Sequence, residues 1–203
     1  MSDQKERDTR FDGLRIILGM AGVMWVLEVI DQLADNRLDQ YGIEPRDSDG
    51  LIGVVAAPFL HGGFDHLVGN TVPFLVMGFV IAAQGAARVV AVTVIVGLVS
   101  GLGTWLIAPE HTIHIGASGI VFGYASYLIS RGFFNRSVLE LVVGAVIAVV
   151  YGSALLGGLL PEDGVSWQGH FFGAVGGVLA ARVLSTRSKA ERNGGESPRA
   201  RLS

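Results

Sequence analysis

Six apolar stretches of nearly membrane-spanning length constrain this chain more than any other feature of its sequence. They lie at about 14–34, 66–84, 88–108, 118–130, 138–160 and 169–185. Most are near the ~20 residues that cross a bilayer as an α-helix. A soluble helical bundle is the alternative, but its helices would keep a polar face, which 88–108 and 138–160 barely have. We therefore predict an all-α, polytopic membrane protein with a bundle of six transmembrane helices.

The distribution of charge predicts how such a bundle is oriented. The net charge is only -3, which argues against a nucleic-acid partner. If the N-terminus lies inside and the spans alternate, 13 of the 15 basic residues fall on the inner side, and 11 of the 18 acidic residues fall in or beside outer segments. Because an excess of Lys and Arg marks cytoplasmic loops, we expect a multi-pass plasma-membrane protein with both termini in the cytoplasm.

Composition divides the chain into three parts. We expect a cytoplasmic N-terminal tail at 1–13, a six-helix domain at 14–185, and a basic, disordered cytoplasmic tail at 186–203. The longest connection, 36–60, begins polar and turns apolar, which predicts an outer loop lying partly in the membrane interface. The chain has no cysteine, so disulfides and cysteine nucleophiles are excluded.

The fourth stretch is too short to cross the membrane. If its helix begins at Ser118 and ends at Arg131, it has about 13 residues, or roughly 20 Å at 1.5 Å per residue. The hydrocarbon core is roughly 30 Å thick, so the helix should begin about 10 Å below the outer surface. Non-helical backbone at that depth must be buried in protein or reached by water. We expect an outward-facing cavity with Ser118 at its floor.

Ser118 is flanked by small residues, in the order Gly116-Ala117-Ser118-Gly119. Glycines allow another backbone or a substrate to approach closely. The N-terminus of a helix also presents free N–H groups of the kind an oxyanion hole requires. Plain helix capping is the competing interpretation, because serine is a favoured N-cap residue.

His170 lies near the outer end of the sixth stretch, at a depth similar to that of Ser118. An ionisable residue inside a membrane suggests function, and histidine acts as base and acid near neutral pH. The alternative is a packed histidine bonded to a backbone carbonyl. Small residues four apart favour close packing of membrane helices. Such pairs occur at Gly119 and Gly123 and at Gly173 and Gly177, and their packing would bring Ser118 to His170.

The second stretch begins with further polar side chains. His66 and Asn70 are four residues apart and share one helix face, and an asparagine amide can donate to an oxyanion. His61, His66 and His170 together raise the alternative of a zinc site, which we do not favour because no carboxylate accompanies them at a zinc-binding spacing. His111 and His114 are interpreted as a solvated loop pair. No carboxylate lies at the depth of Ser118, so a serine–histidine dyad would work without one.

These motifs resemble those of the rhomboid intramembrane serine proteases. The match rests on His61-x4-His66-x3-Asn70, on Gly116-x-Ser118-Gly119 and on Gly169-His170-x2-Gly173-x3-Gly177, in the family's order and on the corresponding spans of its six-helix core. The resemblance covers about residues 14–185.

The resemblance implies roles for individual residues. Ser118 matches the nucleophile and His170 the general base, while Asn70 and His66 match side chains that stabilise the oxyanion. Four further residues match positions that shape the substrate site, namely Gly116, Gly119, His61 and Phe122. Phe122 replaces a tyrosine that stacks on the base in many members, and a phenyl ring retains the stacking. The Trp-Arg pair common in the first outer loop is absent, and its positions hold Ile52 and Gly53.

The function implied by the resemblance is that of a serine endopeptidase without metal or cofactor. Its partners would be the lipid bilayer and transmembrane protein substrates, which would enter between the second and fifth spans; the oligomeric state is left open. A catalytically silent rhomboid-like binding or quality-control protein is the main alternative. A small transporter is less consistent with the sequence, because the spans have few charges in their interior.

Overall fold

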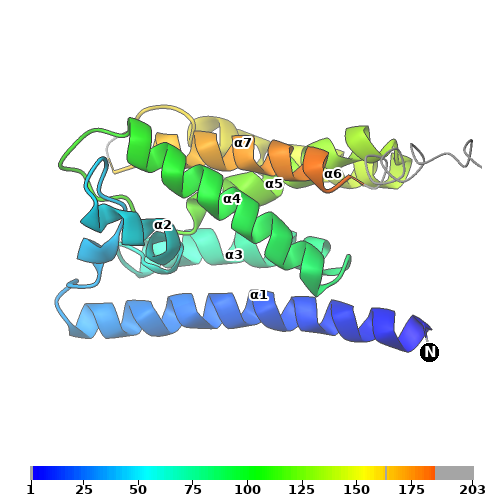
Figure 1. Cartoon of the computed structure of the whole chain (residues 1–203), viewed down its shortest axis with the longest axis horizontal. Helices are drawn as coiled ribbons and strands as arrows, with labels where there is room; N and C mark the ends of the chain where they lie inside the picture. The colour runs from blue at the N-terminus through cyan, green and yellow to red at the C-terminus, as the bar shows by residue number, and fades with distance from the viewer. Residues whose placement is uncertain (1, 163, 186–203) are drawn as a thin grey trace, which may run out of the picture.

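A computed structural model of the chain describes residues 2–162 and 164–185. Six long helices make up most of this structure, as Figure 1 shows: α1 (Ser2–Leu33), α3 (Phe64–Ala82), α4 (Ala86–Ile107), α5 (Ser118–Asn135), α6 (Val138–Gly157) and α7 (Trp167–Val183). Each corresponds to one of the six predicted stretches, so the all-α bundle is confirmed. Four shorter helices lie in the long connection: η1 (Asp39–Tyr41), η2 (Asp49–Ile52), α2 (Gly53–Ala56) and η3 (Ala57–Phe59).

Four of the long helices are long and apolar enough to cross a membrane. They are α1 from Arg7 to Leu33, α3, α4 and α6. Only 11% of the apolar stretch of α6 is buried, and most of its valine and leucine side chains are exposed on the outside of the bundle. Ser118 and Gly119 of the predicted site lie instead on α5, and His170 lies on α7.

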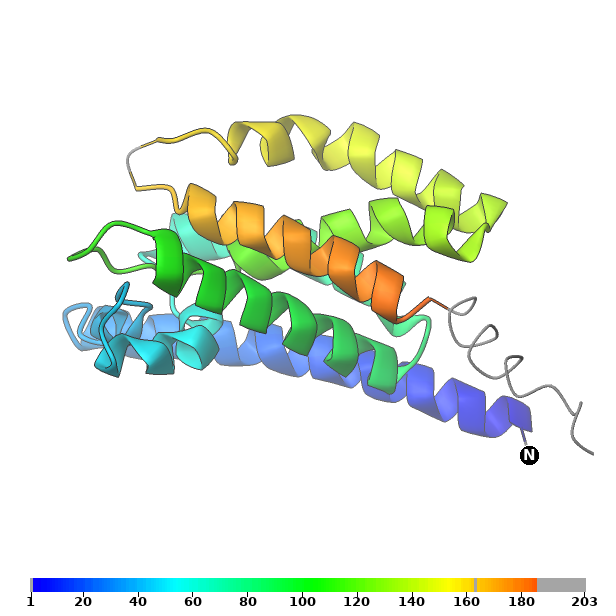
Figure 2. The same ribbon diagram turned by 45° about the horizontal axis from the view of Figure 1, so that its top comes forward.

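The helix α5 lies at the centre of the bundle and packs against α3, α4, α6 and α7. The helix α1 lies along α3 and α4 on one side, whereas α6 lies on the other side against α5, as Figure 2 shows. The buried core includes Met24 of α1, Phe74 of α3 and Tyr124 of α5, and the rings of Phe74 and Tyr124 stack at 5.7 Å between centroids. This core fixes the position of α5 within the bundle.

Glycines bring α5 and α7 into backbone contact. A Cβ atom at Gly173 would collide with the carbonyl oxygen of Gly119, and one at Gly177 would collide with that of Gly123. The predicted pairing of the two small-residue motifs is therefore present. Helices packed this closely fix the start of α7 relative to the start of α5.

The structure corrects two predicted boundaries. Residues 2–13, expected to be a tail, form the first turns of α1, because this segment contains good helix formers and no proline. The helix α5 does begin at Ser118, but it continues past Arg131 to Asn135 and has 18 residues. Arg131 is a good helix former, so the helix continues through it, and its side chain forms an ion pair with Glu140 of α6. The tail predicted at 186–203 lies outside the described residues.

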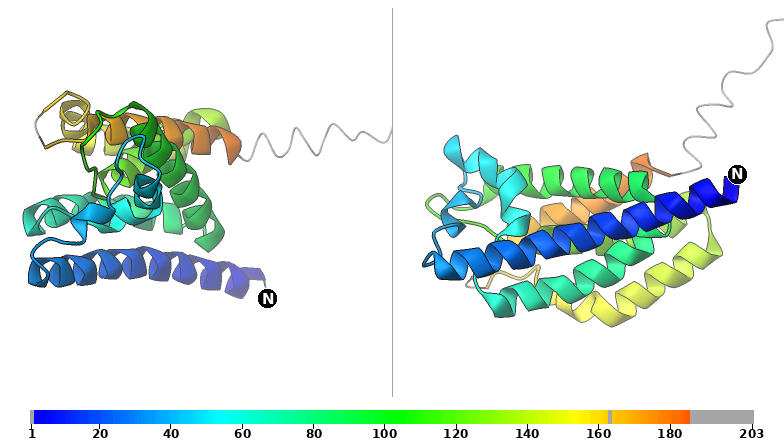
Figure 3. Two further views of the ribbon diagram at one scale, coloured as in Figure 1. Left: turned by 60° about the vertical axis from the view of Figure 1, so that its left-hand side comes forward. Right: turned by 90° about the horizontal axis from the view of Figure 1, so that it is seen from below.

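The predicted depth of Ser118 has support from its neighbours, although the predicted helix length is wrong. Gly119 lies directly against Ser100, which is seven residues before the end of α4. At 1.5 Å per residue this places the start of α5 about 10 Å below that end of the bundle. Figure 3 shows the short helices and the connection between α4 and α5 at this end, and the start of α1 at the other.

Candidate active site

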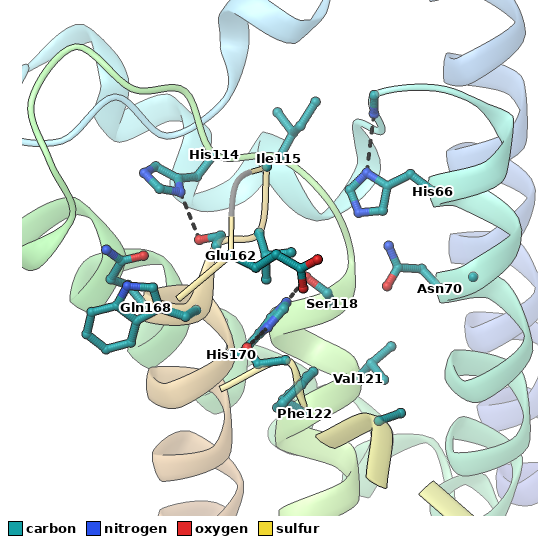
Figure 4. Close-up of a pocket in the computed structure, with 18 of the residues that line it drawn as sticks. His66, Asn70, His114, Ile115, Ser118, Val121, Phe122, Glu162, Gln168 and His170 are labelled. Atoms are coloured by element: carbon teal, nitrogen blue, oxygen red, sulfur yellow. Dashed lines mark hydrogen bonds between the residues drawn. The ribbon is translucent and has the colours of Figure 1, made fainter. Parts of the chain in front are cut away.

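A pocket of about 1230 Å³ opens at the end of the bundle that carries the short helices. Its walls come from α3, with Asn70 and Met77, and from α6, with Tyr151 and Leu155. The loop before α5, the starts of α5 and α7, and the connection between α6 and α7 with Glu162 complete it, as Figure 4 shows. Ser118 lies within this pocket, so the predicted cavity is present at the predicted serine.

Ser118 and His170 are hydrogen-bonded in the pocket. The distance from His170 Nε2 to Ser118 Oγ is 2.8 Å. Ser118 is the first residue of α5 and His170 the fourth of α7, and the glycine contacts between these helices hold the two side chains together. This distance is within the range that general-base activation of a nucleophile requires.

The other ring nitrogen of His170 identifies its tautomer. Nδ1 lies 2.6 Å from the carbonyl oxygen of Gly158, the residue that caps the end of α6. Because a carbonyl oxygen can only accept, Nδ1 must carry the proton, and Nε2 of the neutral ring presents its lone pair to the Ser118 hydroxyl. The same side chain thus makes both the carbonyl bond of a packed histidine and the serine contact that a dyad would require.

Phe122 holds the plane of the His170 ring. The two rings stack with centroids 4.1 Å apart and planes only 5° from parallel, and Phe122 is buried. Phe122 lies one helical turn after Ser118, so α5 presents both the hydroxyl and the stacking surface to the same imidazole. The phenyl ring thus makes the stacking contact that the resemblance implies.

Glycine is required in the loop before Ser118 for two reasons. Gly116 has a φ of 114°, a conformation that residues with a side chain rarely adopt. A Cβ atom there would also lie only 2.7 Å from the ring of His66. On the other side of the serine, Gly119 makes room for Ser100, whose hydroxyl donates to the carbonyl oxygen of Gly169 at 2.8 Å. These contacts join α4, α5 and α7 around Ser118.

Two side chains of α3 offer donors to the pocket. The Nδ2 atom of Asn70 is buried and has no hydrogen-bond partner, which is unusual for an amide group because such burial costs free energy. His66 Nδ1 accepts from the N–H of Gly62 at 3.4 Å, so in the neutral ring Nε2 carries the proton and lies toward Gly116. Figure 4 shows both side chains on the wall of the pocket that faces Ser118.

His61 supports the serine loop from behind. It is 1% exposed, and its Nε2 accepts from the N–H of Ala117 at 3.3 Å. Burial, followed by the neighbouring His66, lowers the pKa of His61 to about 4, so the ring is neutral and able to accept this bond at neutral pH. The structure therefore places His61 beneath the loop, whereas the resemblance implies a position at the rim of the site.

The interpretation of His114 as a solvated loop residue is wrong. Thr112 Oγ1 donates to the carbonyl oxygen of Pro109 at 2.6 Å, so it must accept from His114 Nε2 at 2.8 Å. His114 Nδ1 then accepts from the hydroxyl of Ser166 at 2.8 Å, and Ser166 accepts from the N–H of Gly169. This chain of hydrogen bonds ties the loop before α5 to the N-terminus of α7. Burial lowers the pKa of His114, which favours the neutral ring that these bonds require.

The histidines of the site are engaged in hydrogen bonds to protein groups. Both ring nitrogens of His170 are bonded, and His61 accepts from the backbone. Within the part of the chain that the structure describes, no group of three or more histidine, aspartate or glutamate side chains is arranged to hold a metal ion.

The helices and the pocket define a multi-pass membrane protein with a polar site recessed between its helices. The family model of the Rhomboid domain matches residues 48–187. The chain therefore belongs to the rhomboid family, and the predicted membership is confirmed. The matched region includes α3 to α7 and the whole of the pocket, but not α1.

The chain is similar to several known proteins. An uncharacterized protein of Mycobacterium tuberculosis is 45% identical over 184 residues, which cover 87% of this chain and 77% of that protein. An uncharacterized protein of Mycobacterium leprae is 40% identical over 200 residues, covering 92% and 78%. The Bacillus subtilis protein named "Putative rhomboid protease YdcA" is 28% identical over 134 residues, which cover 66% of each chain.

Proposed function

We propose that this protein is an intramembrane serine endopeptidase that cleaves transmembrane protein substrates. The observation that carries the proposal is the 2.8 Å contact between His170 Nε2 and Ser118 Oγ in a ring whose tautomer leaves Nε2 free to accept. Membership of the rhomboid family supports it. The excess of basic residues at the opposite end of the bundle favours an orientation in which the pocket opens outward from the plasma membrane.

The chemistry follows from the atoms of the site. Ser118 Oγ attacks the carbonyl carbon of the scissile peptide bond while its proton moves to His170 Nε2. The oxyanion that forms would accept hydrogen bonds from Asn70 Nδ2, from His66 Nε2–H and from the free N–H groups at the start of α5. His170 then gives its proton to the leaving amine, and the substrate's acyl group remains as an ester on Ser118. Water, deprotonated by His170, hydrolyses this ester and restores the serine.

A helical substrate must lose part of its helix before it can react. Within an α-helix each peptide carbonyl is bonded to an N–H four residues on and is not available to a nucleophile. The proposal therefore implies substrates with small, helix-destabilising residues near the outer surface of the membrane. The pocket walls formed by α3 and α6 suit the entry of such a segment between these two helices.

The proposal is tested with purified protein reconstituted into liposomes with a model transmembrane substrate. Ser118→Ala and His170→Ala should each abolish cleavage, because one removes the nucleophile and the other the base. Ser153→Ala and His111→Asn are matched controls, since both residues are exposed and outside the pocket. Normal cleavage by both site variants would refute the mechanism.

A fluorophosphonate probe separates the protease from the silent alternative. The probe reacts with serines that have been activated by a base, so wild-type protein should be labelled and Ser118→Ala protein should not. Folded wild-type protein that does not react would favour a rhomboid-like binding or quality-control protein.

A further inference from the structure

The base of this site has an orienting partner that is not a carboxylate. His170 Nδ1 donates to the carbonyl oxygen of Gly158 at 2.6 Å. Gly158 is the C-cap of α6, and the last carbonyls of a helix have no intrahelical N–H to bond. The imidazole thus satisfies an otherwise unpaired carbonyl, and the carbonyl selects the tautomer of the imidazole.

We propose that the Gly158 carbonyl is the positioning group of the catalytic base, so that α6 holds His170 in its reactive tautomer. This inference rests on the proposed function. In the resting state the carbonyl keeps the proton on Nδ1 and leaves the Nε2 lone pair toward Ser118. When His170 accepts the serine proton and becomes positively charged, the same carbonyl still accepts from Nδ1, and the C-terminus of α6 directs its partial negative charge toward the ring.

The assignment couples the wall of the pocket to the reaction. The helix α6 supplies Tyr151, Ala154 and Leu155 to the pocket and packs mainly against α5. A shift of the end of α6 away from α5 would take the Gly158 carbonyl with it and leave Nδ1 without its acceptor. The reaction therefore requires that the end of α6 stay packed against α5 while the substrate occupies the pocket.

The space around residue 158 supports a direct role. A Cβ atom at Gly158 would lie 2.6 Å from Phe122 Cζ and 3.0 Å from His170 Nδ1, so the stacked ring pair fills the place of a side chain. The backbone of Gly158, with φ of -69°, is one that any residue can adopt, so the restriction is one of space alone. A Cβ atom added at the neighbouring Gly157 would have no atom within 4 Å, which makes Gly157→Ala a matched control for Gly158→Ala.

The first test measures the tautomer directly, by ¹⁵N NMR of protein labelled at its five histidines. His170→Asn identifies the signals of His170 by their loss. We expect a protonated Nδ1 and an unprotonated Nε2 in the wild type and in Gly157→Ala, but a mixture of tautomers in Gly158→Ala. Turnover should fall about 10- to 100-fold in Gly158→Ala only, which is the loss seen when a metal-bound histidine loses the hydrogen-bond partner that orients it.

A second pair of variants avoids any change of volume in case Gly158→Ala fails to fold. Replacing Leu159 by its α-hydroxy analogue converts the preceding peptide bond to an ester and makes the Gly158 carbonyl a weaker acceptor. The same replacement at Leu160 is the control, because it also removes one backbone hydrogen bond at the end of α6. The ester at 159 loses the bond from the N–H of Leu159 to Leu156, and the ester at 160 loses the bond from the N–H of Leu160 to Gly157. Only the ester at 159 should lower kcat and disturb the His170 tautomer, with KM unchanged.

The outcomes separate this inference from the proposed function. A wild-type His170 protonated at Nε2, or equal effects of the two esters on tautomer and kcat, would overturn the role of Gly158 even if the protein cleaves substrates. Failure of Ser118 to react with a fluorophosphonate would instead overturn the protease, whereas the NMR result would still establish which atom the Gly158 carbonyl orients.

Discussion

The contact between Gly173 and Gly119 makes Gly173→Ala the sharpest test of how the site is assembled. An added Cβ atom would lie 2.9 Å from the carbonyl carbon of Gly119 and closer still to its oxygen. Carbon atoms in ordinary contact are about 3.5 Å apart or more, so α7 must move away from α5 by at least about 0.6 Å. The obstacle is backbone, which cannot rotate out of the way.

The consequence for the site follows from the position of Gly173, one turn after His170 on the same helix. A movement of this size would lengthen the 2.8 Å contact between Ser118 and His170 to about 3.4 Å or more, beyond the usual range for a hydrogen bond. We expect fluorophosphonate labelling of Ser118 to slow by about 10²-fold, the loss typical of a misplacement of about 1 Å. Overpacking of this kind should also cost about 1–3 kcal/mol of stability.

The assay compares Gly173→Ala with Gly97→Ala and Gly177→Ala. Gly97 lies on α4 and has no atom within 4 Å of an added Cβ, so its variant should label like the wild type and should lose no stability, because alanine favours a helix more than glycine does. Gly177→Ala makes the same kind of collision, with Gly123, but one turn farther from His170, so it should lose stability with a smaller loss of labelling. Wild-type labelling and stability in Gly173→Ala would refute the argument that backbone contact positions the dyad.

Three further predictions follow from residues around the site. The pKa of His61 in the folded protein is about 4, against an ordinary value of 6.5. Its neutral form should therefore contribute up to about 3 kcal/mol of stability, which is present above pH 6.5 and is lost as the pH falls toward 4. His61→Gln should flatten this pH dependence in unfolding titrations, and equal acid sensitivity of the two proteins would contradict the prediction. Ser166→Ala should cost about 1 kcal/mol of stability in thermal unfolding, because it removes the N-cap hydroxyl of α7, which accepts from the N–H of Gly169 and donates to His114. Ser48→Ala is the control, at a helix cap with no side-chain hydrogen bond, and should leave stability unchanged. Equal losses in the two variants would count against the role of the Ser166 bonds. In intact cells an impermeant maleimide should label Ser48→Cys but not Ala83→Cys, both exposed positions in a chain without native cysteine; the reverse pattern would invert the proposed orientation.

The helices and their closest pairing could be predicted because short-range patterns specify them. The length of each apolar stretch reflects the thickness of the bilayer, and residues four apart lie on one helix face whatever the rest of the fold does. Gly119, Gly123, Gly173 and Gly177 therefore identify the contact between α5 and α7 from spacing alone. Once that contact is known, the neighbouring Ser118 and His170 must be close.

The end of α5 could not be predicted because a charged residue after an apolar stretch indicates the limit of the membrane. Arg131 is paired with Glu140 of α6, and Asn135 donates to the same carboxylate. The partner is nine residues away in the next helix, so the isolated stretch gave no sign that the charge is neutralised within the protein. Glu28 and Asp31 show the same limit. They are among the 11 acidic residues that the sequence places in or beside outer segments, but they are 1% and 2% exposed in the structure.

Gly158 and His114 were missed as members of the site for a related reason. One contributes only a backbone carbonyl, which has no signature in sequence, and the other depends on hydroxyl partners at Thr112 and Ser166. The location of His114, two residues before Gly116, was the one signal that could have indicated a structural role. Interactions of this kind appear only when distant segments are placed together.

The use of a carbonyl in place of a carboxylate has a physical reason in a site of this kind. Glu162 lines the pocket but is exposed. A carboxylate bonded to His170 Nδ1 in place of the Gly158 carbonyl would instead have to be buried, and a buried charge with incomplete pairing costs several kcal/mol. The carbonyl of Gly158 is neutral and is already unpaired at the end of α6, so bonding it to Nδ1 removes two unsatisfied groups with no charge to desolvate. The activation of Ser118 likewise needs no buried carboxylate. It depends on the position of α7, which the contact at Gly173 sets. A site inside a membrane thus favours a serine–histidine dyad in which a backbone carbonyl at the end of a helix, here that of Gly158 in α6, orients the histidine.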